Sequence, residues 1–83
     1  MGVTAAQIER TILDLLAARD RTKTICPSEA ARALADDWRP LMEPVRETAR
    51  AMADDGRLEI TQSGRVVEHH AARGAIRLRL PQR

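Results

Sequence analysis

The stretch GRLEITQSGRVV, residues 56–67, contains a change from helical to alternating spacing of apolar side chains. Leu58 and Ile60 lie on one face of the predicted strand, whereas Thr61 lies on the other. The Gln-Ser-Gly sequence that follows predicts a turn in which the glycine takes a positive φ. The chain then returns through the paired valines, so we expect a hairpin near residues 57–68.

A helix is predicted directly before this hairpin. Val45, Ala49 and Met52 recur at helical spacing. Pro44 fits the first turn, where its missing N–H is not needed, and Gly56 is the expected left-handed C-cap. These signals predict a turn followed by a helix of about twelve residues.

Two further helices are predicted nearer the N-terminus. Thr4 and Gln7 form a capping-box pattern, and the apolar residues after them keep helical spacing up to about Arg19. Pro27 at a first helical position begins a second, short helix. Between the two helices, β-branched residues favour a short edge strand near residues 23–26.

A basic strand is predicted near residues 75–80. Its apolar side chains alternate with Arg77 and Arg79, so both guanidinium groups project from the same side, about 7 Å apart along the strand. Pro81 ends the pairing. The sequence therefore predicts an α+β fold with three helices and a small antiparallel sheet, in a single domain over residues 1–83.

The composition excludes several classes of protein. The chain has 83 residues and 14 alanines, so one thin core is expected. One Trp without Tyr or Phe excludes the stacked aromatic side chains of single-strand and RNA binders. A single cysteine excludes a disulfide framework and fits a reducing compartment, so we expect a cytoplasmic protein. We expect neither a membrane-spanning helix nor a secretory signal from this sequence.

Charge is distributed unevenly along the chain. Residues 1–56 carry eight basic against ten acidic side chains, whereas residues 57–83 carry six arginines against two glutamates. Thirteen of the fourteen basic residues are arginine, whose guanidinium group binds phosphate in a bidentate manner. A basic C-terminal third favours a polyanionic partner.

The predicted order of elements is the layout of a winged helix-turn-helix domain. Several local segments add a closer likeness: Ile25-Cys26-Pro27-Ser28-Glu29, Trp38-Arg39, Leu41-Met42, Val45-Arg46, Gly56-Arg57, Thr61-Gln62, Arg73-Gly74 and Ile76-Arg77-Leu78-Arg79. With these segments the chain resembles a bacterial domain-of-unknown-function family, numbered 3253, whose members are small winged-helix proteins. The resemblance covers about residues 7–80 and implies a fold without an established activity. Where the family pattern has Asp-Pro and Gly-Pro, this chain has Glu68-His69 and Gly74-Ala75.

A winged helix-turn-helix domain contacts DNA with the helix after the turn and with its hairpin. The candidate nucleic-acid-binding residues are therefore Arg46, Arg50, Arg65, Arg77 and Arg79. Acidic residues on the same helix, among them Glu43 and Glu47, would repel phosphates, so the hairpin is the stronger candidate. This hypothesis requires the five guanidinium groups to form one continuous basic surface, and it predicts binding of duplex DNA with little base reading.

A second hypothesis is a module for protein–protein contact or dimerisation on the same fold, without nucleic acid. Its partner would be an acidic protein or a second copy of the chain. The same arginine-bearing strand edge, or the Leu13 side of the first helix, would then form the interface.

Catalytic, metal and cofactor sites are not predicted. Cys26 and the histidines lack an oxyanion donor pattern or an orienting acid, so we do not expect an enzyme. His69 and His70 are adjacent in a segment expected to be extended, where they would point in opposite directions and could not easily share one metal ion. Trp38 is expected to anchor the core.

Overall fold

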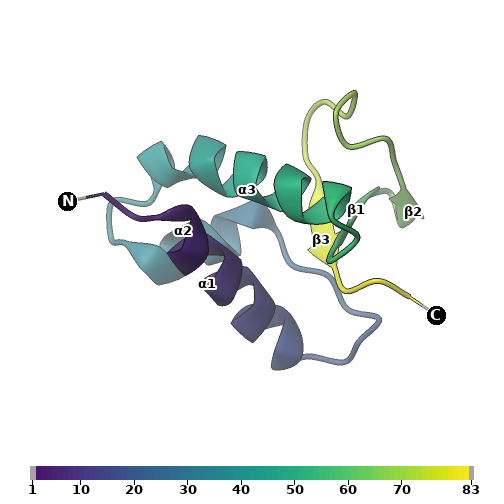
Figure 1. The fold of residues 1–83 in the computed structure, drawn as a ribbon, viewed down its shortest axis with the longest axis horizontal. Helices are drawn as coiled ribbons and strands as arrows, with labels where there is room; N and C mark the ends of the chain where they lie inside the picture. Colours follow the sequence, from purple (N-terminus) through teal and green to yellow (C-terminus); the bar gives the residue numbers. More distant parts are fainter. Residues whose placement is uncertain (1, 83) are drawn as a thin grey trace.

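The computed structural model describes residues 2–82. Its elements are α1 (Ala5–Ala17), α2 (Pro27–Leu34), the 3₁₀ turn η1 (Arg39–Leu41), α3 (Met42–Asp54), β1 (Glu59–Gln62), β2 (Arg65–Val66) and β3 (Arg77–Arg79). Figure 1 shows the three helices packed together, with the small sheet beside the C-terminal end of α3. The structure is therefore α+β, with three helices and a three-stranded antiparallel sheet, and it is compatible with a winged helix.

The first two helices begin at the predicted residues. The N–H of Gln7 donates to Thr4 Oγ1 at 3.2 Å, and the N–H of Thr4 donates to Gln7 Oε1 at 2.8 Å, which completes the capping box. This helix ends at Ala17, slightly before the predicted Arg19. Pro27 occupies the first turn of α2, as predicted.

The region around Pro44 also forms as predicted. The turn before the main helix is the 3₁₀ segment η1, and Pro44 lies in the first turn of α3. Gly56 follows the helix with φ of +76°, a left-handed conformation that favours glycine. The main helix therefore passes directly into the hairpin.

The sheet has the strand order β2-β1-β3. In the hairpin turn both central residues have positive φ, Ser63 at 52° and Gly64 at 80°, which is typical of a type I′ turn. The predicted edge strand near residues 23–26 is reduced to one bridge, in which Ile25 and Leu78 exchange two hydrogen bonds of 2.8 Å. Only one residue pairs because Pro27 starts α2 immediately afterwards.

One hydrophobic cluster joins the helices to the sheet. Its buried members are Ile8, Ile12, Leu16, Ile25, Ala30, Ala31, Val45, Ala49, Met52, Leu58, Ile60, Ile76 and Leu78. Thr61 lies on the strand face opposite to Ile60, as predicted, yet it is only 1% exposed. It lies in the central strand, between Val66 and Arg77 of the neighbouring strands. Within residues 2–82, each helix is too short or too polar to cross a bilayer.

Candidate functional site

The two arginines of β3 lie on the same face of the sheet. Arg77 is opposite Thr61 and Arg79 is opposite Glu59, and these residues of β1 are two apart. Residues that pair in register share a face, and residues two apart on a strand share it too. This face is opposite to the one that Ile60 and Leu78 bury in the core.

The two side chains have different surroundings. Arg77 is exposed, and its Nε and Nη2 donate to Oγ1 and the carbonyl oxygen of Thr24 at 2.7 and 3.2 Å. Arg79 is half-buried, and its Nε donates to Glu59 Oε1 at 2.8 Å. The hydrogen-bond partners of Arg77 are therefore neutral, whereas the positive charge of Arg79 is offset by the carboxylate of Glu59.

The two arginines of α3 also differ. Arg46 Nη2 donates to the carbonyl oxygen of Gly74 at 2.7 Å and so holds the loop after β2, residues 67–75, against the helix. Arg50 Nη1 lies 3.7 Å from Glu43 Oε1. The sequence suggested that acidic residues on this helix would oppose phosphate binding by its arginines. The structure places such an acidic residue beside Arg50, whereas the partner of Arg46 is a neutral carbonyl group.

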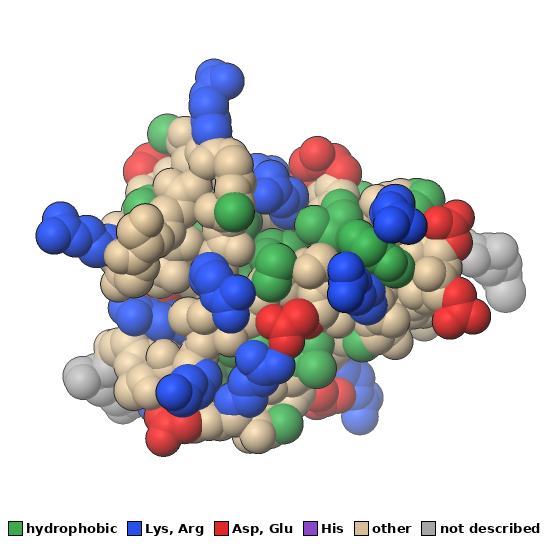
Figure 2. All heavy atoms as spheres, turned by 180° about the vertical axis from the view of Figure 1, so that it is seen from behind, with side chains coloured by type: hydrophobic (Ala, Val, Ile, Leu, Met, Phe, Trp, Pro, Cys, Tyr) green, Lys and Arg blue, Asp and Glu red, His purple; other side chains and the backbone are tan. Residues whose placement is uncertain are grey.

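Arg65 lies just after the hairpin turn and is exposed. It pairs in register with Gln62, two residues beyond Ile60, and so lies on the core-facing side of the sheet, opposite to Arg77 and Arg79. The expectation that all five arginines form one continuous surface is therefore wrong. Figure 2 shows basic side chains spread over the rear face with acidic ones between them, and some protruding at the hairpin end.

Gln62 and Arg73 were not among the site residues predicted from the sequence. Gln62 Nε2 donates to the carbonyl oxygens of Arg73 and Ala75 at 2.7 and 3.1 Å, which holds the 67–75 loop beside the hairpin. Arg73 is exposed and has no ion-pair partner within residues 2–82. The stretch from Gly64 to Arg73 contains one acidic residue, Glu68, and this was the sequence feature that could have identified Arg73 as a candidate.

His69 and His70 point toward the same carboxylate, contrary to the expectation that they diverge. Their Nε2 atoms lie 2.6 and 2.8 Å from Oδ1 of Asp54. The segment is a turn rather than extended, closed by a hydrogen bond from Ala71 N–H to the carbonyl oxygen of Glu68. Hydrogen bonds from the two imidazoles hold the pKa of Asp54 below its usual value.

The family model described as "Protein of unknown function (DUF3253)" matches residues 5–81. The chain belongs to this family. No curated protein sequence matches it. The resemblance noted in the sequence is thereby confirmed, and the DUF3253 family description carries no activity.

Trp38 belongs to one of the segments that carry the DUF3253 resemblance. It is half-buried and packs against the hydrophobic core, so it fills the expected anchoring role from the edge of the core. Guanidinium groups lie over its ring, Arg32 at 4.5 Å and Arg39 at 4.8 Å from the centroid. These distances are typical of cation–π contacts, which pair the ring with two positive charges of the chain itself.

Cys26 in this DUF3253 chain is half-buried at the N-terminus of α2. Ser28 Oγ donates to its Sγ at 3.2 Å. Within residues 2–82 no hydrogen bond joins the thiol to either histidine, because both imidazoles lie at Asp54. The pairing of nucleophile and base that a cysteine enzyme requires is therefore not assembled between these residues.

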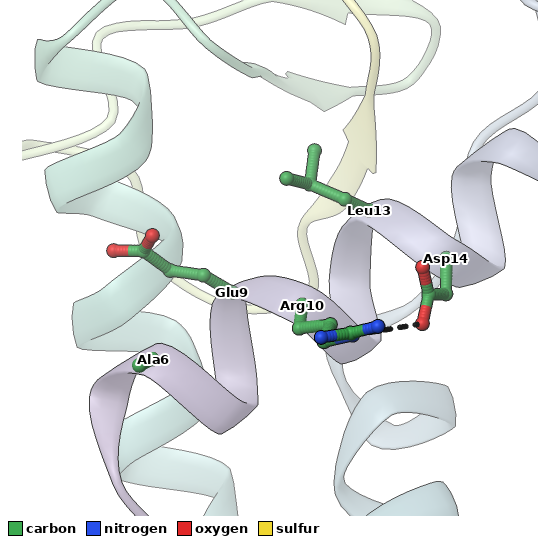
Figure 3. A pocket seen from close by; sticks show the side chains of 5 residues that line it. All are labelled: Ala6, Glu9, Arg10, Leu13 and Asp14. Atoms are coloured by element: carbon green, nitrogen blue, oxygen red, sulfur yellow. Dashed lines mark ion pairs between the residues drawn. The ribbon is translucent and has the colours of Figure 1, made fainter.

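An open depression of about 420 Å³ lies along α1 (Figure 3). It is lined by Ala6, Glu9, Arg10, Leu13 and Asp14. Arg10 Nε lies 4.0 Å from Asp14 Oδ2, and Arg57 donates to both oxygens of Glu9 and lowers the pKa of that carboxyl. The charges of this depression are thus paired within the chain, and none of the candidate arginines lines it.

Proposed function

We propose that this protein binds duplex DNA, with little sequence preference, through phosphate contacts from the hairpin turn and the 67–75 loop. The observation that carries the proposal is the state of Arg65 and Arg73. Both are exposed on adjoining segments, and neither has an ion-pair partner within residues 2–82. Such guanidinium groups are available to bind phosphate oxygens.

The remaining candidate arginines contribute unequally to this proposal. Arg46 has only a carbonyl partner and adjoins the same loop, so it is the third expected contact. Arg77 has neutral hydrogen-bond partners, but it lies on the sheet face opposite to that of Arg65. Arg50 and Arg79 are paired with carboxylates and should add little. The expected contact set is therefore Arg46, Arg65 and Arg73.

Binding by this set would act through charge neutralisation. Each neutralised phosphate releases condensed counterions, so three contacts predict a slope of about −3 in a plot of log affinity against log salt concentration. No groove-reading side chain is required, because phosphate contacts carry no sequence information by themselves. The affinity should therefore be modest and strongly dependent on salt.

Fluorescence anisotropy with a random-sequence duplex at low and moderate salt tests the proposal. The Arg65→Ala/Arg73→Ala double variant should weaken low-salt binding at least about tenfold and reduce the salt slope by about two. Glu59→Ala/Arg79→Ala is the matched control, since it removes an ion pair and leaves the net charge unchanged. Absence of binding at low salt, or equal losses in the double variant and the control, would contradict the proposal.

The second hypothesis, a protein-interaction module, receives less support from the described surface. Val66, 56% exposed, is its only large exposed apolar side chain within residues 2–82. A single exposed valine is ordinary for a monomer and does not make an apolar docking patch. The available surface is polar and arginine-rich, which favours a polyanionic partner. Sedimentation velocity with and without duplex distinguishes the two, because only a DNA-binding domain would sediment together with added duplex.

A further inference from the structure

Three metal-ligating side chains meet where α3 ends. Asp54 is the last residue of α3, and His69 and His70 lie in the turn that follows β2. One ligand atom of each residue lies within 4.8 Å of the others. The two imidazole rings are 4.5 Å apart, tilted by 45°, with both Nε2 atoms directed at the same carboxylate oxygen.

The turn is what brings two adjacent histidines to one point. Besides the backbone hydrogen bond that closes it, the N–H of His70 donates to Glu68 Oε1 at 2.9 Å. On the other side, Arg46 and Gln62 hold the end of the same loop. The arrangement is thus supported at both ends by contacts that do not involve the three ligand atoms.

We propose that Asp54, His69 and His70 form a binding site for a divalent transition-metal ion, with Zn²⁺ as the best-suited ion. Two imidazole nitrogens and one carboxylate oxygen are a common zinc donor set, and three protein ligands leave a fourth position for water. Calcium and magnesium prefer sites made of oxygen alone. Among first-row ions, Cu²⁺ is expected to compete.

Binding of the ion requires an adjustment of these distances. Ligand atoms about 2.0–2.1 Å from a tetrahedral zinc ion lie about 3.3 Å apart. The two hydrogen-bonded pairs, now at 2.6 and 2.8 Å, would therefore separate by roughly 0.5–0.7 Å, and the ligand atoms of the two histidines would reach the same spacing from a separation of at most 4.8 Å. The proton of each neutral imidazole would move from Nε2 to Nδ1.

Exposure of the three side chains also suits an ion that enters from solvent. His70 is 61% exposed and Asp54 50%, whereas His69 is 19% exposed. The His69 side chain is therefore largely enclosed by neighbouring residues. The exposed side chains of Asp54 and His70 leave the site open to an ion from solvent. An ion bound here would join the 67–75 loop to the end of α3, whether or not the loop binds DNA.

Isothermal titration calorimetry of the untagged chain with zinc chloride tests the site. One ion per chain is expected, and Asp54→Asn or His70→Ala should weaken its affinity at least about tenfold. Asp55→Asn is the matched control, since that neighbouring carboxylate lies on Arg57 instead. Cys26→Ser is the second control, and it should leave the affinity unchanged. Circular dichroism verifies that each variant is folded.

A spectroscopic readout identifies the ligand atoms directly. Zinc should shift the ¹⁵N resonances of both ring nitrogens of His69 and His70, because Nε2 exchanges its proton for the ion while Nδ1 gains a proton. Absence of binding at millimolar zinc, equal affinity in wild type and His69→Ala/His70→Ala, or loss of binding in Cys26→Ser would overturn the proposal. One ion per two chains with zinc-dependent dimerisation would overturn it as well, because the site would then be shared between copies.

Discussion

Glu29 shows how one side chain stabilises a helix start in this protein. One carboxylate oxygen accepts the Cys26 N–H at 2.7 Å, and the other accepts a hydrogen bond from Arg19. Partial burial by itself would raise the pKa of Glu29, but the hydrogen bonds from Cys26 and Arg19, with the positive charges of Arg19 and Arg77, lower it below its ordinary value. Glu29 therefore joins α2 to the end of α1 in its ionised form.

Replacement of this carboxylate should have a pH-dependent effect. Because the folded pKa lies below the unfolded value of about 4.3, the stabilisation is complete above that value and is lost as the pH falls through the folded pKa. Glu29→Gln should lower the free energy of unfolding by about 1 kcal/mol at neutral pH and by less in acid. Urea unfolding at pH 7 and at about pH 3 measures both differences. Glu47→Gln, at an exposed position of α3, is the control.

At the scale of elements, the hairpin depends on the backbone conformation of its turn. A Cβ built at Gly64 meets nothing within 4 Å, so sterics with neighbours do not require glycine there. Its φ of +80° does, because L-residues are disfavoured in the left-handed region. The same turn places Arg65 immediately after it, so the turn also positions a proposed phosphate contact.

Gly64→Ala should therefore destabilise the protein by about 1–2 kcal/mol through conformational strain alone. Urea unfolding monitored by circular dichroism measures the loss. Gly2→Ala, at an open position without a positive φ, should change stability by less than about 0.5 kcal/mol. Equal effects of the two substitutions would mean that the turn does not take the type I′ conformation in solution.

At the scale of the whole molecule, Leu78 connects the sheet to the helical part. It is fully buried, pairs with Ile60 in β1 and forms the bridge with Ile25. Ile25 lies two residues before Pro27, where α2 begins. Leu78 of β3 therefore contacts both the sheet and the segment that leads into the helices. A cavity at this position would affect the packing of helices and sheet together.

Leu78→Ala should cost about 2–5 kcal/mol, a large share of the roughly 5–15 kcal/mol that stabilises a typical domain. Thermal unfolding should show a strongly lowered midpoint or no cooperative transition. Val66→Ala removes an apolar side chain from an exposed position of the same sheet and should change stability by less than about 0.5 kcal/mol. A mild effect of Leu78→Ala would contradict the connecting role.

Most of the fold was predictable because its signals are local. The capping box at Thr4, the proline that starts α2 and the glycine after α3 each act within one helical turn. The edge strand was less predictable, since its length depends on where α2 begins and on a partner more than fifty residues away. The divergence expected of His69 and His70 was wrong because it assumed an extended segment where the chain turns.

The sequence by itself determined the helices, the hairpin and the family, since spacing, caps and turn residues act between near neighbours along the chain. Only the tertiary structure decided which charged groups remain available. Arg79 meets Glu59, Arg46 meets Gly74 and Asp54 meets two histidines, and these partners are far apart in sequence. Strand register then separates Arg65 from Arg77, because side chains alternate between the faces of a sheet and only the folded pairing shows which face each one takes.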